Sequence, residues 1–177
     1  MLNTSVLFPI CEEDDPLSVA NSLASVSSQG VEVLAWCISS YKIERLPESC
    51  RGRIVRYESD DFGKMVREMF SRTSESKLIH FLKAGTYMLP GFYDSSAIML
   101  ESSRLDYCFV HALVLESGKL SSISSPIPDS DVNESQVVVR RWVLGELGVE
   151  SVLGTLGRVV EEYRGVEIDS TLCIEVK

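Results

Sequence analysis

The sequence predicts an α/β fold with a mainly parallel central sheet that is flanked by helices on both faces. Short apolar runs alternate with amphipathic segments along the chain, and this alternation is typical of parallel strands joined by helices. The run Val31–Ile38 is apolar at nearly every position, as expected for a strand buried on both faces of a parallel sheet. The 177 residues, 45% of them hydrophobic, suit one domain over residues 1–177 with a substantial core.

The first half of the chain contains the strongest signals for individual elements. Asp15 followed by Pro16 is typical of a helix N-cap and first turn, and Gly30 ends the helix that they begin. A second helix is predicted by apolar residues at helical spacing, namely Phe62, Met65, Val66, Met69 and Phe70. Four apolar runs are the expected strands: Ser5–Ile10, Val31–Ile38, Arg53–Tyr57 and Leu78–Leu82. Their order implies parallel pairing with right-handed crossovers.

The second half of the chain is predicted to continue with shorter elements. Helices are expected over Phe92–Ser102, Trp142–Leu147 and a last apolar stripe from Val152 to Tyr163. Strands are expected over Tyr107–Leu115, Val137–Val139 and Val166–Val176. Residues 117–136 are rich in Ser, Pro, Asp and Gly without periodicity, so we expect an irregular loop there.

Composition excludes several classes of function. The net charge of −9 argues against broad binding to nucleic acid, because such binding needs Lys and Arg to neutralise phosphates. No apolar run approaches the length of a membrane span, and the N-terminus lacks the features of a signal peptide. The five scattered cysteines have no metal-binding spacing, so we expect free thiols and a cytoplasmic protein.

The stretch Lys77–Phe92 is the most informative part of the sequence. It begins with an expected strand, breaks at Lys83-Ala84-Gly85 and turns at Pro90-Gly91 into a helix. In an α/β sheet, ligands sit in the crevice outside the carboxyl ends of the strands. We therefore expect residues 83–85 to lie at a ligand-binding edge of the sheet.

Several phrases, in their order and spacing, resemble the family 2 nucleotide-sugar glycosyltransferases, which have the Rossmann-like glycosyltransferase A fold. The phrases are Val6–Leu17, Ser22–Gln29, Val31–Ser40, Phe62–Glu68, Lys77–Phe92 and Arg140–Gly148. This resemblance covers nearly the whole chain. It implies a nucleotide-binding half over residues 1–90, an acceptor-side half over residues 91–177, and a nucleotide-diphospho-sugar donor.

The chain departs from this family where the family binds its metal. Active members generally hold Mn²⁺ or Mg²⁺ with an Asp-any-Asp motif directly after the fourth strand, because hard cations need oxygen ligands. The matching residues here are Lys83-Ala84-Gly85, and neither aspartate is present. Family members also carry acidic residues at the end of the second strand, where this chain has Cys37 and Ile38. The resemblance therefore implies a degenerate motif, and we assign no metal ligand.

The resemblance also assigns roles to the remaining candidates. Glu150 is the loose match to the acidic catalytic base that accepts a proton from the acceptor. Five residues are matched to the donor site: Pro9, Glu12, Asp61, Lys83 and Arg141. In this interpretation the ammonium of Lys83 offsets the charge of the diphosphate in place of a metal.

Each acidic or basic candidate also has a structural interpretation. Lys83 is consistent with a solvated loop residue in a motif that has decayed. Acidic residues favour helix N-termini with or without a ligand, which applies to Glu12 beside Glu13 and to Asp61 beside Asp60.

The remaining polar candidates are two arginines and two histidines. Arg140 and Arg141 are consistent with a phosphate site or with a solvated pair at the end of a strand. His80 and His111 lie within apolar runs, so we expect both to be buried, hydrogen-bonded core residues.

Two functions follow from these observations. The first is a glycosyltransferase that transfers a sugar from a nucleotide-sugar donor. The alternative is a catalytically inactive domain of the same fold that serves as a binding or assembly module, which explains the missing carboxylates directly. The chain is also short for this family, so an acceptor site could come from a protein partner or from a second copy.

Overall fold

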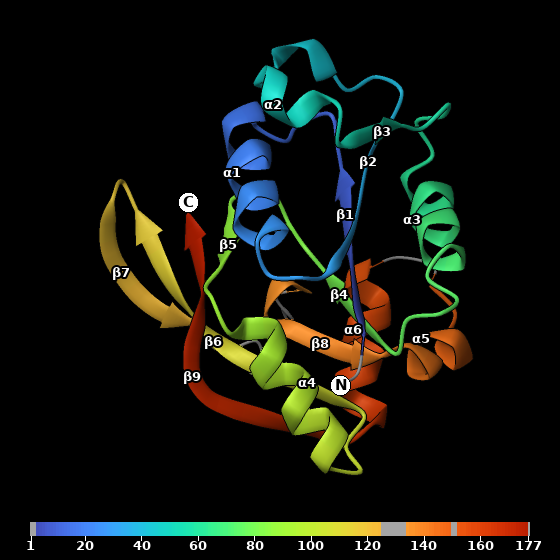
Figure 1. Ribbon diagram of the computed structural model, residues 1–177, viewed down its shortest axis with the longest axis vertical. Helices are drawn as coiled ribbons and strands as arrows, with labels where there is room; N and C mark the ends of the chain where they lie inside the picture. Colours follow the sequence, from blue (N-terminus) through green and yellow to red (C-terminus); the bar gives the residue numbers. More distant parts are fainter. Residues whose placement is uncertain (1–2, 125–133, 150–151, 177) are drawn as a thin grey trace.

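The computed structural model describes residues 3–124, 134–149 and 152–176 (Figure 1). They form a nine-stranded mixed sheet in the order β3-β2-β1-β4-β8-β6-β9-β5, with β7 paired to β6. The strands are β1 (Thr4–Ile10), β2 (Glu32–Cys37), β3 (Ile54–Arg56), β4 (Leu78–Phe81), β5 (Thr86–Met88), β6 (Tyr107–Glu116), β7 (Lys119–Ser124), β8 (Val137–Arg140) and β9 (Gly165–Val176). The helices are α1 (Pro16–Ser27), α2 (Glu48–Arg51), α3 (Phe62–Ser71), α4 (Phe92–Ser102), α5 (Arg141–Leu147) and α6 (Val152–Glu162), with short 3₁₀ turns η1 (Ile43–Arg45) and η2 (Glu134–Gln136).

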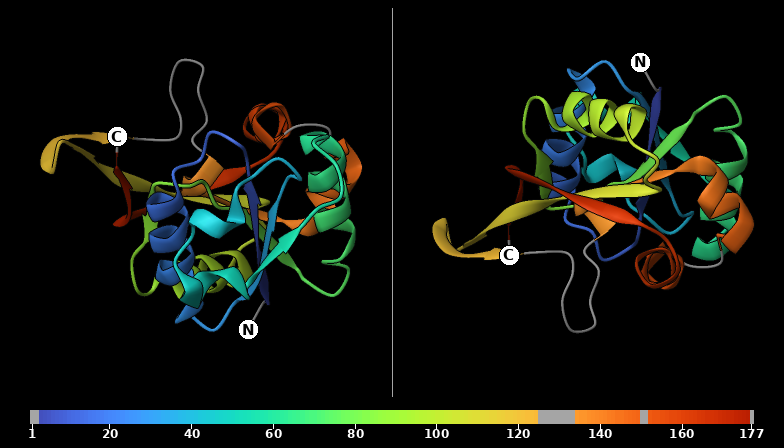
Figure 2. Two further views of the ribbon diagram at one scale, coloured as in Figure 1. Left: turned by 90° about the horizontal axis from the view of Figure 1, so that it is seen from above. Right: turned by 90° about the horizontal axis from the view of Figure 1, so that it is seen from below.

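The first four strands form the parallel half of the sheet, as predicted. β1 lies between β2 and β4 and is parallel to both, and β3 extends the sheet beyond β2. The connections through α1 and α3 cross the sheet in opposite directions, so right-handed crossovers put these helices on opposite faces. Figures 1 and 2 show α1 and α4 on one face and α3 and α6 on the other.

The second half of the sheet is mixed, and it contains two strands that were not predicted, β5 and β7. β8 is antiparallel to β4 and β6, whereas β9 is parallel to β6 and antiparallel to β5. The irregular loop predicted over 117–136 is wrong for residues 119–124, which form β7 and pair with β6. Pairing with β6 makes these residues a strand, although their serine-rich sequence does not predict one. Residues 125–133 of the predicted loop lie outside the described residues.

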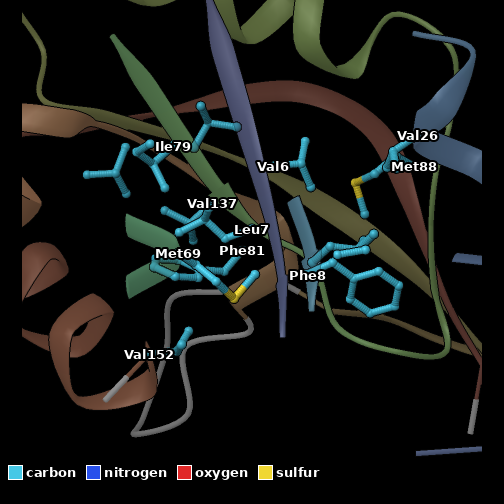
Figure 3. Packing of buried hydrophobic residues seen from close by; sticks show 14 of the residues in the cluster. Val6, Leu7, Phe8, Val26, Met69, Ile79, Phe81, Met88, Val137 and Val152 are labelled. Carbon is cyan, nitrogen blue, oxygen red and sulfur yellow. The ribbon is translucent and has the colours of Figure 1, made fainter. Parts of the chain in front are cut away.

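Side chains of β1 fill the core on both faces of the sheet. Val6 and Phe8 point towards Val26 of α1, whereas Leu7 points to the opposite side, with Phe81 of β4 (Figure 3). All five residues are at most 1% exposed. Each such side chain stabilises the fold by about 1.5–3 kcal/mol relative to exposure, so β1 anchors the edge at which the candidate site lies.

Two helix starts agree with the capping signals in the sequence. Asp15 accepts a 2.9 Å hydrogen bond from the amide of Ser18 at the start of α1, and Pro16 occupies the first helical position. Asp61 accepts a 2.9 Å bond from the amide of Lys64 at the start of α3. Both carboxylates satisfy amides that the first turn of a helix leaves without a partner.

The two histidines have different environments. His80 is fully buried, and its ring nitrogens bond the Tyr93 hydroxyl at 2.9 Å and the Ser135 carbonyl at 3.0 Å, so the prediction of a core histidine is confirmed. For His111 the prediction is wrong. Its side chain is 27% exposed and pairs with Glu167 on the outer face of β6 and β9. The alternation of a strand turns every second residue of an apolar run outward.

None of the helices in the described part of the chain is long and apolar enough to cross a membrane.

Candidate functional site

A cleft of about 360 Å³ opens at the carboxyl ends of β1 and β4, on the face covered by α3 and α6. Its walls come from the ends of both strands, from the starts of both helices and from η2. The lining residues are Pro9, Cys11, Asp14, Phe62, Phe81, Leu82, Lys83, Ala84, Glu134 and Val152. This is the edge at which an α/β sheet places its ligands, and we refer to this space as the cleft.

Three charged side chains meet in the cleft: Asp14, Lys83 and Glu134. Burial raises the pKa of the Asp14 carboxyl above its ordinary value, and the nearby charge of Lys83 acts in the opposite direction. Burial likewise raises the pKa of Glu134, again opposed by Lys83. Lys83 therefore serves as a common counter-charge for two partly desolvated carboxylates, and the three groups together carry one negative charge when all are ionised.

The turn after β1 aims Asp14 into the cleft. The amide of Cys11 donates a 2.7 Å hydrogen bond to Oδ2 of Asp14, which holds this carboxylate back against the strand end. The thiol of Cys11 shares the same surroundings, and burial, reinforced by the charge of Asp14, raises its pKa to about 12. Cys11 is therefore a neutral thiol at physiological pH and a weak nucleophile.

η2 brings Glu134 to the cleft because the residue after it is fastened to β4. The hydroxyl of Ser135 accepts a 2.9 Å hydrogen bond from the amide of Lys83, and its carbonyl bonds Nε2 of His80 at 3.0 Å. Both bonds are buried or partly buried. The buried histidine thus positions the loop that carries Glu134, although it does not line the cleft itself.

The backbone of β9 crowds Gly85, the position matched to the second carboxylate of an Asp-any-Asp motif. Gly85 has φ +85°, and a Cβ at this position would lie 3.2 Å from the carbonyl oxygen of Val176. Its amide donates to the Ser22 hydroxyl at 3.0 Å, and its carbonyl accepts from the amide of Val176 at 2.9 Å. β9 and α1 therefore occupy both sides of this residue.

The residues at the motif do not fit a divalent metal. Lys83 stands where the first aspartate is expected and Gly85 where the second is expected. The described residues contain no group of three or more His, Cys, Asp or Glu side chains that could hold a metal ion. Hard divalent cations in proteins take six or more oxygen ligands, several of them from carboxylates or water, and this strand end offers an ammonium instead.

The end of β2 has buried, apolar residues at the two positions that the resemblance matches to acidic nucleotide contacts. Cys37 is fully buried and Ile38 is 8% exposed, and the amide of Ile38 bonds the Ile10 carbonyl at 3.2 Å. Asp60 fastens the loop that follows, accepting bonds from the Ser39 hydroxyl at 2.7 Å and the Ser40 amide at 2.8 Å. Two positions that the resemblance matches to acidic nucleotide contacts are thus parts of the core.

The structure brings some of the predicted site residues together. Pro9 and Lys83 both line the cleft. Glu12 is exposed in the same loop but does not line the cleft, and Asp61 uses its carboxylate as the cap of α3. Glu150, the expected catalytic base, lies outside the described residues.

The two arginines lie at the other end of β4. Arg140 pairs with Leu78 at the amino end of that strand, and its guanidinium bonds the carbonyls of Leu105 at 2.7 Å and Ser103 at 3.2 Å beyond α4. Arg141 stacks over the ring of Phe70, 4.6 Å from its centroid. The structure therefore does not bring Arg141 together with Lys83, and phosphate binding by Arg141 stays a prediction.

Sequence reasoning missed the two carboxylates that the cleft contains. Asp14 belongs to the acidic run Glu12–Asp15, but nothing in that run distinguishes the residue that turns inward. Glu134 belongs to the segment interpreted as an irregular loop. The signal that could have found it is its place three residues before β8, because a residue there lies close to the end of the neighbouring antiparallel strand β4.

The chain has the glycosyltransferase A fold, with the cleft at the carboxyl ends of the parallel strands. It is similar to residues 1–349 of TarS from S. aureus in complex with UDP-GlcNAc, with a TM-score of 0.69 and 13% identity over 99% of this chain and 59% of that one. It is also similar to glucosyl-3-phosphoglycerate synthase from Mycobacterium tuberculosis in complex with Mg²⁺ and UDP, with a TM-score of 0.59 and 14% identity over 98% of this chain and 71% of that one.

These likenesses concern the fold. The chain spans about three fifths of the TarS chain that it matches. No protein-family model matches the sequence, and no curated protein does so at a significant level.

Proposed function

We propose that this chain is a glycosyltransferase A domain that works as a nucleotide-sugar-binding module and does not perform metal-dependent sugar transfer. The observation that carries the proposal is the backbone at Gly85, the position matched to a metal-binding carboxylate, where β9 is bonded to the loop and a side chain would crowd the carbonyl oxygen of Val176. The similar proteins from S. aureus and M. tuberculosis were solved with UDP-GlcNAc and with UDP, which makes a uridine nucleotide the first ligand to test.

The charges in the cleft predict how such a ligand would bind. A diphosphate would meet Lys83 together with Asp14 and Glu134, so the carboxylates oppose the attraction of the ammonium. The pKa values of both carboxyls are raised, so they take up protons at higher pH than ordinary carboxyls do. Protonation removes the repulsion. Nucleotide affinity is therefore expected to be low at neutral pH and to increase at mildly acidic pH.

Calorimetric titration with UDP-GlcNAc and other nucleotide sugars, with and without Mn²⁺, tests this function. We expect binding that Mn²⁺ leaves unchanged, that tightens as the pH falls, and that occurs without release of sugar. A control variant, Asp14→Asn with Glu134→Gln, removes both negative charges and is expected to bind more tightly at neutral pH. Affinity that requires Mn²⁺, or sugar transfer that requires it, would overturn the proposal.

One observation favours a second function, sugar transfer without a metal. The charge of Lys83 reaches the cleft and could offset a leaving diphosphate. This alternative predicts slow transfer in the absence of any divalent ion. It also predicts that Lys83→Met abolishes transfer more strongly than it weakens nucleotide binding, because the developing charge is larger in the transition state.

A further inference from the structure

Four strands carry a continuous apolar surface on the sheet face that also contains the cleft. Cross-strand pairing aligns Leu113 with Ile123 of β7 and with Ile174 of β9, and Ile174 with Tyr87 of β5. Leu115 is aligned in the same way with Leu120 and Val176. Directly paired residues share one face of a sheet. We call this set the apolar face: Tyr87, Leu113, Leu115, Leu120, Ile123, Ile174 and Val176.

A β-bulge is what completes the apolar face. The pairing of β6 with β7 shifts between Val114 and Leu115, so that Ser122 opposes Val114 whereas Leu120 opposes Leu115. Without this shift, Leu120 and Ile123 would point to opposite faces, because they are three residues apart in a strand with a period of two. The extra residue turns both apolar side chains of β7 to the same side.

The seven side chains of the apolar face are uncharged, and three of them are well exposed. Leu120 is 61% exposed, Ile123 is 62% exposed and Val176 is 42% exposed. The charged residues of these strand ends lie on the other face, where Glu116 pairs with Lys119 across the hairpin. A contiguous exposed apolar patch of this kind is uncommon on a monomer and usually marks an interaction surface.

We propose that the apolar face is the interface of a homodimer, in which two copies pack these faces against each other about a two-fold axis. An interface of this kind presents the same patch on both subunits, so an apolar, neutral face is matched by its own copy. The chain carries a net charge of −9, which makes most of its surface repel a second copy. Among the described residues, the seven side chains of this face carry no charge, and the acidic side chain beside them on the same face, Glu167, is paired with His111.

The dimensions of the apolar face suit the core of such an interface. Four strands, about 4.8 Å apart, give an apolar strip roughly 15 Å wide. A stable interface buries about 800 Å² on each partner, with an apolar core inside a polar rim. Seven apolar side chains supply that core, and the His111–Glu167 pair together with Thr171 of β9 lies where the rim would be. Two sheets that pack face to face lie about 10 Å apart.

The proposed interface adjoins the cleft. Val176 belongs to the apolar face, and its amide bonds the carbonyl of Gly85, two residues after Lys83. A second copy docked on this face would therefore lie beside the cleft and could supply part of its wall.

Sedimentation velocity of the full chain over a concentration series tests this inference. We expect a reversible dimer. Leu120→Glu is expected to raise the dimer dissociation constant roughly a hundredfold, because the two-fold axis places two unpaired carboxylates in the apolar core. Ile123→Thr keeps a β-branched side chain and is expected to weaken the dimer in the same direction by a smaller factor.

A matched control lies on α1. Leu17 is 63% exposed, close to the exposure of Leu120, but belongs to a helix on the opposite face of the sheet. Leu17→Glu is expected to leave the dimer unchanged, with circular dichroism confirming that each variant is folded. A wild-type chain that stays monomeric at every concentration would overturn the inference, and so would equal effects of Leu17→Glu and Leu120→Glu.

Discussion

The amide of Val176 donates a 2.9 Å hydrogen bond to the carbonyl of Gly85, and the carbonyl oxygen of Val176 lies 3.2 Å from the place of a Cβ on Gly85. The end of β9 therefore covers the strand-end loop at the residue matched to the second metal-binding aspartate. At the position matched to the second carboxylate, β9 is bonded to the loop, and a Cβ would crowd the carbonyl oxygen of Val176.

Gly85→Ala is expected to destabilise the protein by more than the strain of a left-handed residue alone. A non-glycine residue at positive φ costs roughly 1–2 kcal/mol, and the approach of Val176 adds to this cost. Gly30→Ala is the control, because Gly30 has φ +69° and no atom within 4 Å of the added Cβ. Urea unfolding should give a larger loss for Gly85→Ala, and equal losses would show that Val176 does not close the position.

Lys83→Met is expected to raise the pKa values of both cleft carboxyls further. Burial raises these values in the wild type, and the charge of Lys83 lowers them, so its removal leaves burial unopposed. Carboxyl carbon NMR titration of Asp14 and Glu134 measures the change. Added salt should shrink the difference between variant and wild type, because Lys83 is exposed and its charge is screened. If the pKa values of both residues were unchanged, the charge of Lys83 would not act on the two carboxyls.

The buried histidine predicts a loss of stability in mild acid. Burial lowers the pKa of His80 from 6.5 to about 4, so the folded protein keeps the ring neutral while the unfolded chain takes up a proton. Its contribution is complete above pH 6.5 and is lost as the pH falls from 6.5 to about 4, by roughly 3 kcal/mol in total. Raised carboxyl pKa values act in the opposite direction, so the comparison with His80→Gln isolates the effect. The variant should lose less stability over this range, and identical pH profiles would contradict the assignment.

The neighbouring arginines are expected to differ in their effect on stability. Arg140 holds backbone carbonyls beyond the end of α4, and bonds from a charged donor make Arg140→Met cost about 2 kcal/mol. Arg141→Met removes a stacking contact with Phe70 and should cost about 0.5–1 kcal/mol. Thermal unfolding measures both. Calorimetry with UDP tests the phosphate role of Arg141, and because it lies at the far end of β4 we expect unchanged affinity.

Local signals in the sequence were sufficient for the parallel half of the fold. The Asp15 and Pro16 start of α1, the stripe of α3 and the apolar run of β2 each depend on residues close together in the chain. The order of these elements then restricts the sheet to few arrangements. The glycosyltransferase A fold could therefore be predicted from the sequence.

The contents of the cleft depend on contacts between distant residues, which the sequence alone does not show. Glu134 reaches Lys83 only because Ser135 bonds the end of β4 from 52 residues away. The choice of Asp14 over Glu12 depends on one hydrogen bond to Cys11. Arg141 follows a strand that runs antiparallel to β4, and this reversal places it away from the cleft.

The central claim is that a divalent metal has no place at residues 83–85. Crystals of the full chain soaked with UDP and Mn²⁺ test it most directly, because manganese gives an anomalous signal that locates the ion. We expect no manganese peak beside Lys83, Ala84 or Gly85, with β9 still bonded to Gly85. A manganese ion bound there, between the diphosphate of UDP and this loop, would contradict the account.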